Sequence, residues 1–381
     1  MALPEPTPEA RAHSDRVAGH IRENIAASGG WIGFARYMEL ALYAPGLGYY
    51  SAGAKKLGKA GDFVTAPEIS PLFGQTLAQQ VRQGLDAGLD AVLEVGAGSG
   101  ALAATLLEEL ERSGKAPRSY LILELSADLR ERSRDTLAAR VPHLLERVAW
   151  LNVLPPAFSG IVIGNEVLDA MPAHVVRMRG GRIEEGGVAE RSGRFDWSWR
   201  LASGELLEAA AALDLPEGFR TEIQLAARGF VRTLGTVLEK GLAIFVDYGF
   251  PAREYYHPQR SEGTLMCHYR HHAHADPFFL PGLQDITSHV DFSAIARAAR
   301  EGGLDLAGYT SQAQFLVNCG ITGIMSRTPA EDAGKFLPLA NQANRLMSPA
   351  EMGELFKVLA LTKGFAAPLA GFHEGDRRGS L

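Results

Sequence analysis

Three glycines that directly follow a short apolar run constrain this fold more than any other feature. The segment 93–102 reads LEVGAGSGAL, so an apolar strand at 91–95 leads through Gly96, Gly98 and Gly100 into a helix. Glycine lets the backbone turn sharply and lets a ligand approach closely, and the free N–H groups at the helix start attract electron-rich ligand atoms. The pattern therefore predicts a strand–turn–helix unit that binds a nucleotide.

Short apolar runs and helical segments alternate around this unit. A helix that begins after Ser126 and ends near Arg140 is one example, with the Ser126 side chain as its N-terminal cap. Short strands buried on both faces and separated by helices predict a parallel sheet with right-handed crossovers. The fold class is therefore α/β, with a Rossmann-like, mostly parallel sheet. The further predicted strands lie at 120–123, 148–151, 161–164 and 242–246.

The remaining segments are predicted to elaborate one core, which suits a chain of 381 residues. We expect a helical N-terminal extension at 1–89, the core at 90–172 and 219–250, an inserted β-meander at 173–218, and acceptor-side loops, helices and closing strands that form a lid at 251–381. Within these segments, helices are predicted at 8–28, 31–42, 67–86, 221–240, 291–301 and much of 313–347, a half-helix at 165–171, and a closing edge strand at 355–361.

Charge and composition exclude several classes of protein. The net charge is −6 and the basic residues are scattered, which argues against nucleic acid and suits a small molecule or a basic protein segment. The two cysteines have no metal-site spacing, and no apolar run is long enough to span a membrane. Glu5, Glu9 and Asp15 near the start argue against a mitochondrial transit peptide, so we expect a cytoplasmic location.

Two acidic residues favour one nucleotide over another. Glu124 ends the second predicted strand, where a carboxylate can bind both hydroxyls of a ribose. Glu94 lies two residues before Gly96, where a carboxylate disfavours a pyrophosphate but favours a ligand that carries an ammonium and a sulfonium. S-adenosylmethionine is therefore the expected cofactor. Gly96, Gly98 and Ala101 also satisfy the loose dinucleotide fingerprint, so a nicotinamide cofactor stays an alternative, as does a glycine turn that binds nothing.

Two further features have more than one interpretation. Asn152, just after the third predicted strand, is placed to contact the adenine edge, or else to cap a turn. The histidines at 268–274 follow no recognised ligand spacing and no acidic residue completes them, so we expect no metal.

Polar residues at the end of the fourth predicted strand are candidates for the chemistry, because ligands of such sheets bind beyond the carboxyl ends of the strands. Glu166 and Asp169 are three apart, so on a helical turn both carboxylates share one face and could hold a guanidinium beside the methyl group. Asn165 offers a donor and an acceptor. The alternative is a helix cap with a solvated acidic turn. Asp247 and His289 are candidates for substrate binding, although Asp247 could cap its strand and His289 could stabilise a helix start.

Six blocks of the sequence resemble the MidA-like methyltransferase family, which includes mitochondrial complex I assembly methyltransferases. The blocks are 61–74 (GDFVTAPEISPLFG), 94–100, 165–172 (NEVLDAMP), 247–249 (DYG), 281–292 (PGLQDITSHVDF) and 353–358 (GELFKV). The resemblance implies a class I S-adenosylmethionine fold and, for the characterised mitochondrial members, symmetric dimethylation of an arginine on a complex I core subunit. It also implies that Asp62, Thr65 and Glu68 belong to a loop that closes over the cofactor.

Together these features predict methyl transfer to a protein nitrogen, with an accessible arginine of a partner protein as the acceptor. A homodimer is compatible with the sequence. Two alternatives stay open: a non-catalytic assembly factor that keeps the cofactor pocket, and a nicotinamide-dependent oxidoreductase.

Overall fold

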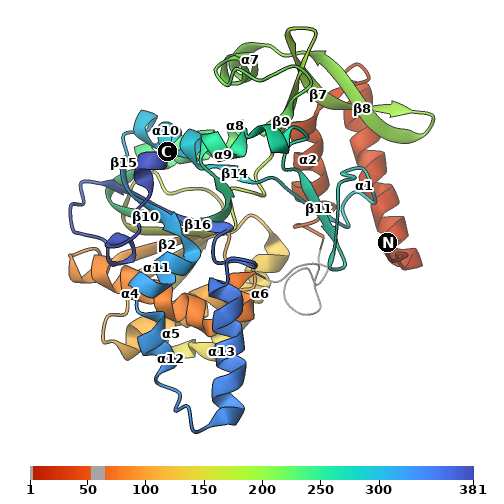
Figure 1. Ribbon diagram of the computed structural model, residues 1–381. Coiled ribbons are helices and arrows are strands. Elements are labelled where there is room, and N and C mark those ends of the chain that lie inside the picture. Colours follow the sequence, from red (N-terminus) through yellow and green to blue (C-terminus); the bar gives the residue numbers. More distant parts are fainter. Residues whose placement is uncertain (1–2, 53–64) are drawn as a thin grey trace. The chain divides into compact units, whose positions relative to one another are not determined.

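The computed structural model describes residues 3–52 and 65–381, and the chain forms two compact units (Figure 1). The first, called the sheet unit here, comprises Val64–Leu168, Phe230–Gly249 and Phe292–Leu381. The second, called the meander unit, comprises Met1–Phe63, Asp169–Gly229 and Phe250–Asp291.

A largely parallel sheet forms the centre of the sheet unit. Its strand order is β15-β16-β10-β5-β2-β3-β4, and the four pairs from β10 to β4 are parallel. Strand order reverses between β2 and β5, and ligands of such sheets bind at this switch point. The strands are β2 (Ala91–Val95), β3 (Ser119–Leu123), β4 (Val148–Leu151), β5 (Phe158–Asn165), β10 (Leu238–Phe250), β15 (Asp305–Ser311) and β16 (Phe356–Lys363).

The local sequence explains these elements. All five residues of β2 are buried, as expected of a strand covered on both faces. Ser126 caps the helix α6 by accepting a hydrogen bond from the Leu129 N–H at 3.2 Å, which confirms the predicted cap. The predicted parallel α/β fold is likewise confirmed. The helices of this unit are α3 (Ala66–Ile69), α4 (Pro71–Asp86), α5 (Ala101–Arg112), α6 (Ala127–Arg140), α10 (Phe292–Glu301), α11 (Gln312–Asn318), α12 (Ile321–Met325) and α13 (Ala333–Met347).

Two predicted elements are wrong in position or type. The strand predicted at the sheet edge is β16, which lies inside the sheet between β10 and β15 and pairs antiparallel with both. Its residues Phe356–Thr362 are all buried, which requires neighbours on both sides. The helix predicted at 221–240 begins only at Leu225 as α8 (Leu225–Val237). Residues 220–223 instead form β9 (Arg220–Ile223), which pairs with β6 (His174–Arg179).

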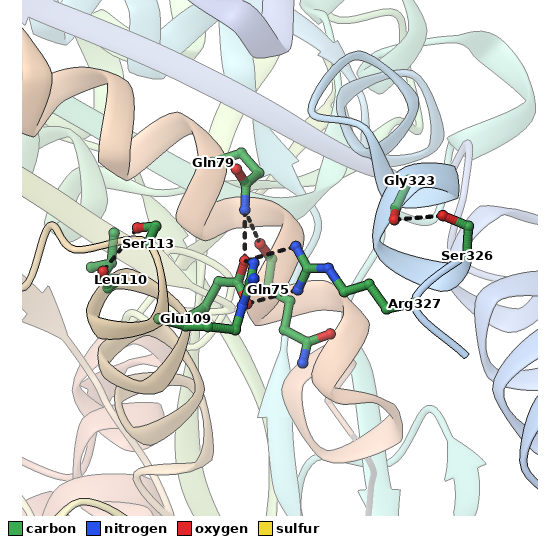
Figure 2. Close-up of polar contacts among 9 residues, drawn as sticks. Gln75, Gln79, Glu109, Leu110, Ser113, Gly323, Ser326 and Arg327 are labelled. Carbon is green, nitrogen blue, oxygen red and sulfur yellow. Dashed lines mark hydrogen bonds and ion pairs between the residues drawn. The ribbon is translucent and has the colours of Figure 1, made fainter. Parts of the chain in front are cut away.

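A buried carboxylate in the sheet unit forms hydrogen bonds that link α4, α5 and the segment after α12 (Figure 2). Glu109 of α5 accepts hydrogen bonds from Gln79 of α4 and from Arg112, and both of its oxygens bind the guanidinium of Arg327, which follows α12. Burial acts to raise the pKa of Glu109, but the hydrogen-bonded guanidinium groups outweigh it and lower that pKa to about 2. Glu109 therefore stays negatively charged, and its hydrogen bonds hold α5 against α4 and against the segment that follows α12.

The meander unit combines helices with two small antiparallel sheets. Residues 174–201 form the predicted meander, in which β7 pairs with β6 and β8. Aromatic side chains such as Phe34, Tyr37 and Trp197 pack in its core with the apolar faces of α1 and α2. The elements are α1 (Pro8–Ala27), β1 (Ile32–Gly33), α2 (Phe34–Tyr43), β6 (His174–Arg179), β7 (Arg182–Arg191), β8 (Arg194–Leu201), α7 (Gly204–Ala211), β9 (Arg220–Ile223), α9 (Ala252–Tyr255), β11 (Met266–Tyr269), β12 (His272–His274), β13 (Asp285–Thr287) and β14 (Val290–Asp291). Within the described part of the chain, no helix combines the length and apolarity that a membrane crossing requires.

Candidate functional site

The glycine turn between β2 and α5 needs all three of its glycines. Gly96, Gly98 and Gly100 have φ values of 67°, 55° and 79°, a left-handed region that side chains rarely adopt. A Cβ on Gly100 would also lie 2.8 Å from the Cα of Ser133, so the third glycine permits close packing of α5 against α6. The turn thus brings the backbone close to the start of α5 beyond the end of β2, where the sequence predicts a nucleotide site.

Glu94 places a buried carboxylate directly before this turn. Its side chain accepts a hydrogen bond of 2.6 Å from the Tyr120 hydroxyl, and no Lys or Arg of the described residues forms an ion pair with it. Burial raises the pKa of Glu94 from its ordinary value of 4.5 to about 7; the Tyr120 hydrogen bond opposes this rise and the nearby Glu124 adds to it. A buried carboxylate without a cationic partner is suited to a ligand that brings a positive charge.

Glu124, at the end of β3, lies on the other side of the glycine turn. Its carboxylate accepts hydrogen bonds from the backbone N–H groups of Ser126 at 2.9 Å and Gly98 at 3.4 Å. Burial raises the pKa of Glu124, and these backbone hydrogen bonds act against the rise. The arrangement brings Glu124 to the turn, where the sequence predicts contacts with a ribose.

Asn152 and Glu68 also lie in the sheet unit beside these residues. Arg130 donates a hydrogen bond to the Asn152 side chain and further ones to the carbonyl groups of Glu124 and Leu151, so Asn152 is held at the ends of β3 and β4. Glu68 of α3 accepts a hydrogen bond from the Ser99 hydroxyl in the glycine turn. These contacts fit the predicted cofactor residues, although the individual roles stay predictions.

The other residues of the predicted closing loop are less informative. Thr65 precedes α3, and its carbonyl accepts hydrogen bonds from the N–H groups of Glu68 and Ile69. Asp62, predicted to join them, lies outside the described residues.

Two exposed apolar side chains at this edge of the sheet were missed by sequence reasoning. Leu125 directly follows Glu124 and is 72% exposed, and Val153 directly follows Asn152 and is 74% exposed. Large apolar side chains that remain exposed at a polar site commonly contact an apolar part of a ligand. The signal in the sequence was an apolar residue immediately after each strand end, where a polar turn residue is usual.

The end of β5 carries a strained residue. Glu166 has a φ of 53°, which is rare for a residue with a side chain and costs free energy that the surroundings must offset. Its N–H donates to the Val246 carbonyl at 2.8 Å, and its carboxylate accepts a hydrogen bond from Asn165 Nδ2 at 3.1 Å. Asn165 Oδ1 is buried and has no hydrogen-bond partner among the described residues, so it can accept from a ligand.

The half-helix predicted at 165–171 is wrong. These residues form the end of β5 followed by bends and a turn, because the left-handed conformation of Glu166 is incompatible with a right-handed helical turn. Glu166 and Asp169 therefore do not share a helical face, so their three-residue spacing does not bring the two carboxylates onto one side. Their separate roles stay predictions.

Asp247 makes contacts of the kind expected from the second interpretation of this residue, a cap of its strand. Its buried carboxylate accepts hydrogen bonds of 2.9 Å from the backbone N–H groups of Leu168 and Tyr248. Through Leu168 it holds the segment that follows Glu166. These contacts favour a positioning role for Asp247 over direct contact with a substrate.

In the meander unit, the segment that contains His289 is held on both sides. The Gln224 side chain donates to Ser288 Oγ at 3.1 Å and accepts from the Asp291 N–H at 3.2 Å. The His289 N–H donates to Thr264 Oγ1 at 3.1 Å. The Ser288 N–H donates to the Asp169 carbonyl at 3.1 Å, so this segment also fixes the backbone of the second predicted catalytic acid.

A buried glutamate supports this arrangement. Glu222 accepts hydrogen bonds from the Thr264 N–H at 2.8 Å and from its hydroxyl at 2.9 Å. The His289 ring stacks on Phe250, with centroids 5.3 Å apart, and Arg260 lies 4.0 Å from the centroid of Phe250.

In the part of the chain that the structure describes, no three His, Cys, Asp or Glu side chains gather in a way that could hold a metal ion.

The fold and the glycine-turn site define a class of enzyme. A parallel sheet with an antiparallel strand between β10 and β15, a G-x-G-x-G turn and acidic residues at 94 and 124 are features of a class I S-adenosylmethionine-dependent methyltransferase. Residues 72–310 match the model of the family described as "Putative S-adenosyl-L-methionine-dependent methyltransferase". The match covers more than half of the chain, and the chain belongs to this MidA-like family.

Similar proteins agree with this assignment. A crystal structure from Burkholderia thailandensis, described as a COG1565 superfamily member bound to S-adenosyl-homocysteine, is 52% identical with a TM-score of 0.96, and the match covers 100% of both chains. The mitochondrial protein arginine methyltransferase NDUFAF7 homolog of Drosophila melanogaster is 28% identical over 98% of this chain and 93% of its own length. The mouse protein arginine methyltransferase NDUFAF7 is 29% identical over 92% of this chain and 86% of its own length.

These comparisons confirm the cofactor and correct the location. S-adenosylmethionine is the cofactor, as Glu94 and Glu124 predicted, and the nicotinamide alternative is set aside. The predicted cytoplasmic location is contradicted by the curated relatives, whose names describe mitochondrial proteins. The prediction relied on the acidic residues near the start of this sequence.

Proposed function

We propose that this methyltransferase transfers its methyl group to a guanidinium nitrogen of an arginine on a partner protein, and that this partner is a subunit of respiratory complex I. The observation that carries the proposal is the strained Glu166 at the carboxyl end of β5. Its carboxylate is oriented by Asn165, and the strain costs free energy that a purely structural turn would not need. Relatives named protein arginine methyltransferases, 27–29% identical over most of the chain, support the acceptor.

In this proposal the protein positions the acceptor and manages its charge. S-adenosylmethionine supplies a methyl group already activated by its sulfonium. Glu166 accepts hydrogen bonds from the guanidinium and orients one nitrogen, and the buried Asn165 Oδ1 accepts another N–H. Asp169 is the second acid assigned to the acceptor. The new N–C bond replaces the S–C bond of the sulfonium, and S-adenosylhomocysteine leaves. A carboxylate beside the guanidinium offsets the positive charge and accepts the proton that the methylated nitrogen loses.

Labelled S-adenosylmethionine, the purified protein and purified complex I subunits test the proposal. We expect label in one protein, and acid hydrolysis is expected to release the label as methylarginine. Label on lysine or on a small molecule would contradict the acceptor, and label on an arginine of a protein outside complex I would contradict only the named partner.

Matched variants distinguish catalysis from a structural role. Glu166→Gln and Asp169→Asn should each lower kcat by about 100-fold while S-adenosylhomocysteine still stabilises the protein in a thermal shift. Asp135→Asn, an exposed acid on α6, is the control and should retain full activity. If the protein is a non-catalytic assembly factor, Glu166→Gln and Asp169→Asn would leave cellular function intact.

A further inference from the structure

Strand β8 is an open edge of the meander sheet. β7 pairs with β6 and with β1 along one side and with β8 along the other. Among the residues that the structure describes, β8 pairs only with β7. Eight residues, from Arg194 to Leu201, thus leave one row of backbone groups without a strand partner. Natural proteins commonly cover or pair such an edge.

The register shows which groups point outward. The Ala202 N–H donates to the Ile183 carbonyl at 3.0 Å, and these two residues continue the β7–β8 register by one step. In an antiparallel pair, residues that exchange hydrogen bonds alternate with residues whose backbone groups point away. The even-numbered residues of β8 therefore bond to β7, and the outward backbone groups belong to Phe195, Trp197, Trp199 and Leu201.

We propose that β8 pairs antiparallel with β8 of a second copy of this chain, in a register centred on Ser198. This register places Asp196 opposite Arg200 of the second copy, and symmetry forms the same pair twice. It places Trp197 opposite Trp199, an aromatic pair of the kind that stabilises adjacent strands. It also covers Leu201, which is 61% exposed, with Phe195 of the second copy.

The charges on β8 and the length of the paired segment together select this register among those that the outward groups allow. A centre at residue 195 would also pair Arg194 with Asp196, but only residues 194–196 of β8 would then lie opposite each other. A shift of the centre to residue 197 would place Arg194 opposite Arg200, and a shift to residue 196 would place Asp196 opposite itself. A centre at residue 199 would leave Arg200 opposite Ser198 and pair no opposite charges. Like charges directly opposite each other destabilise a strand pair, and opposite charges stabilise it.

The contacts that pairing would replace are weak ones. In the single chain the Trp197 N–H donates to Asp196 Oδ1 at 2.8 Å, and Arg191 forms an ion pair with the same carboxylate at 3.5 Å. The Arg200 guanidinium lies 4.5 Å from the centroid of the Trp31 ring, a contact that is weak at an exposed site. Both side chains of that ion pair are exposed, so it contributes little to stability. Pairing transfers the Trp197 N–H to a backbone carbonyl of the second copy and releases the Asp196 carboxylate for Arg200. Self-association of this kind is independent of the acceptor proposed above.

A cysteine at the centre of the register is a direct test. Ser198→Cys places two thiols opposite each other, and we expect a disulfide-linked dimer under mild oxidation. Arg194→Cys is the matched control on the same face of the strand, because the two copies of residue 194 would lie about 26 Å apart, far beyond disulfide reach. The natural Cys267 and Cys319 are buried and contribute little background. Equal cross-linking of both variants, or none of Ser198→Cys, would overturn the proposal.

Charge reversal tests the register without a covalent bond. Sedimentation at about 1–100 µM should show the unmodified chain in a monomer–dimer equilibrium. Asp196→Arg should weaken the dimer at least about tenfold, and Asp196→Arg combined with Arg200→Asp should restore it to within about threefold. Circular dichroism establishes that each variant is folded. A chain that stays monomeric throughout, or a dimer indifferent to Asp196→Arg, would refute the pairing.

Discussion

Glu94→Gln is expected to make the cofactor-free protein more stable. The folded protein holds the proton of Glu94 more tightly than the unfolded chain does, because burial raises its pKa from 4.5 to about 7. Stability therefore falls as the pH rises from 4.5 to 7 and stays low above 7. This rise in pKa corresponds to about 3 kcal/mol, and the cost of burying the glutamine amide offsets part of the stability that the substitution gains. At about pH 8 we expect Glu94→Gln to raise the free energy of unfolding by roughly 1–3 kcal/mol.

The same substitution should weaken the binding of S-adenosylmethionine. It removes the negative charge from a buried site and retains an oxygen that accepts the Tyr120 hydrogen bond. We expect the affinity to fall by roughly 10- to 100-fold at about pH 8. In the unmodified protein, lowering the pH from about 8 to about 6 should weaken binding about tenfold, because most Glu94 side chains then carry a proton. Glu94→Gln should abolish this pH dependence.

Isothermal titration calorimetry and urea unfolding at several pH values measure both effects. Glu131→Gln, at an exposed position on α6, is the control and should alter neither quantity. If Glu94→Gln binds S-adenosylmethionine as tightly as the unmodified protein, or if it loses stability at about pH 8, the assigned role of the buried charge is refuted.

Three further substitutions test the fold and the site. Gly100→Ala combines a left-handed φ with a contact of 2.8 Å to Ser133, so it should cost about 2–4 kcal/mol in urea unfolding; a loss below about 0.5 kcal/mol would contradict the close packing. Glu109→Gln should cost about 2–3 kcal/mol at about pH 7 and nearly nothing at about pH 2, because the stabilising charge is lost as the pH falls from 4.5 toward 2. Leu125→Asp should weaken S-adenosylhomocysteine binding at least about tenfold in calorimetry without lowering the melting temperature of the cofactor-free protein; an unchanged affinity would exclude contact between Leu125 and the cofactor.

The strands, helix cap and acidic residues around the glycine turn could be predicted from sequence because each depends on only a few neighbouring residues. The burial of β2 and the cap at Ser126 each depend on a few consecutive residues. The acid at 124 was recognisable because it ends a strand about two dozen residues after the glycine turn. The position of β16 between β10 and β15 could not be predicted from local sequence. The run at 356–362 is apolar on both faces, which is equally consistent with several positions in a sheet until its partners are known.

The conformation of residues 165–171 was harder to predict because contacts with β10 override the conformational preference of the local sequence. Glycine, or less often asparagine, is the residue expected at a left-handed position, so Glu166 gave no sign of its conformation. A helical turn was the locally sensible interpretation of residues 165–171. Leu125 and Val153, which lie beside the predicted cofactor residues, were missed for a different reason: exposed apolar residues are common and singly carry little information.

The conformation of Glu166 is imposed from β10. Val246 accepts the Glu166 N–H, and the next residue, Asp247, accepts the N–H of Leu168, so two adjacent positions of β10 fix both sides of the strained residue. A left-handed glutamate costs of order 1–3 kcal/mol, and hydrogen bonds of about 1–2 kcal/mol each can offset that cost. The Asp247 carboxylate is thus bound to the backbone amides of Leu168 and Tyr248, and we predict that it acts on the chemistry through the orientation of Glu166. Loss of Asp247 would release the turn without removing any group assigned to the acceptor, and this distinguishes a positioning residue from a binding one.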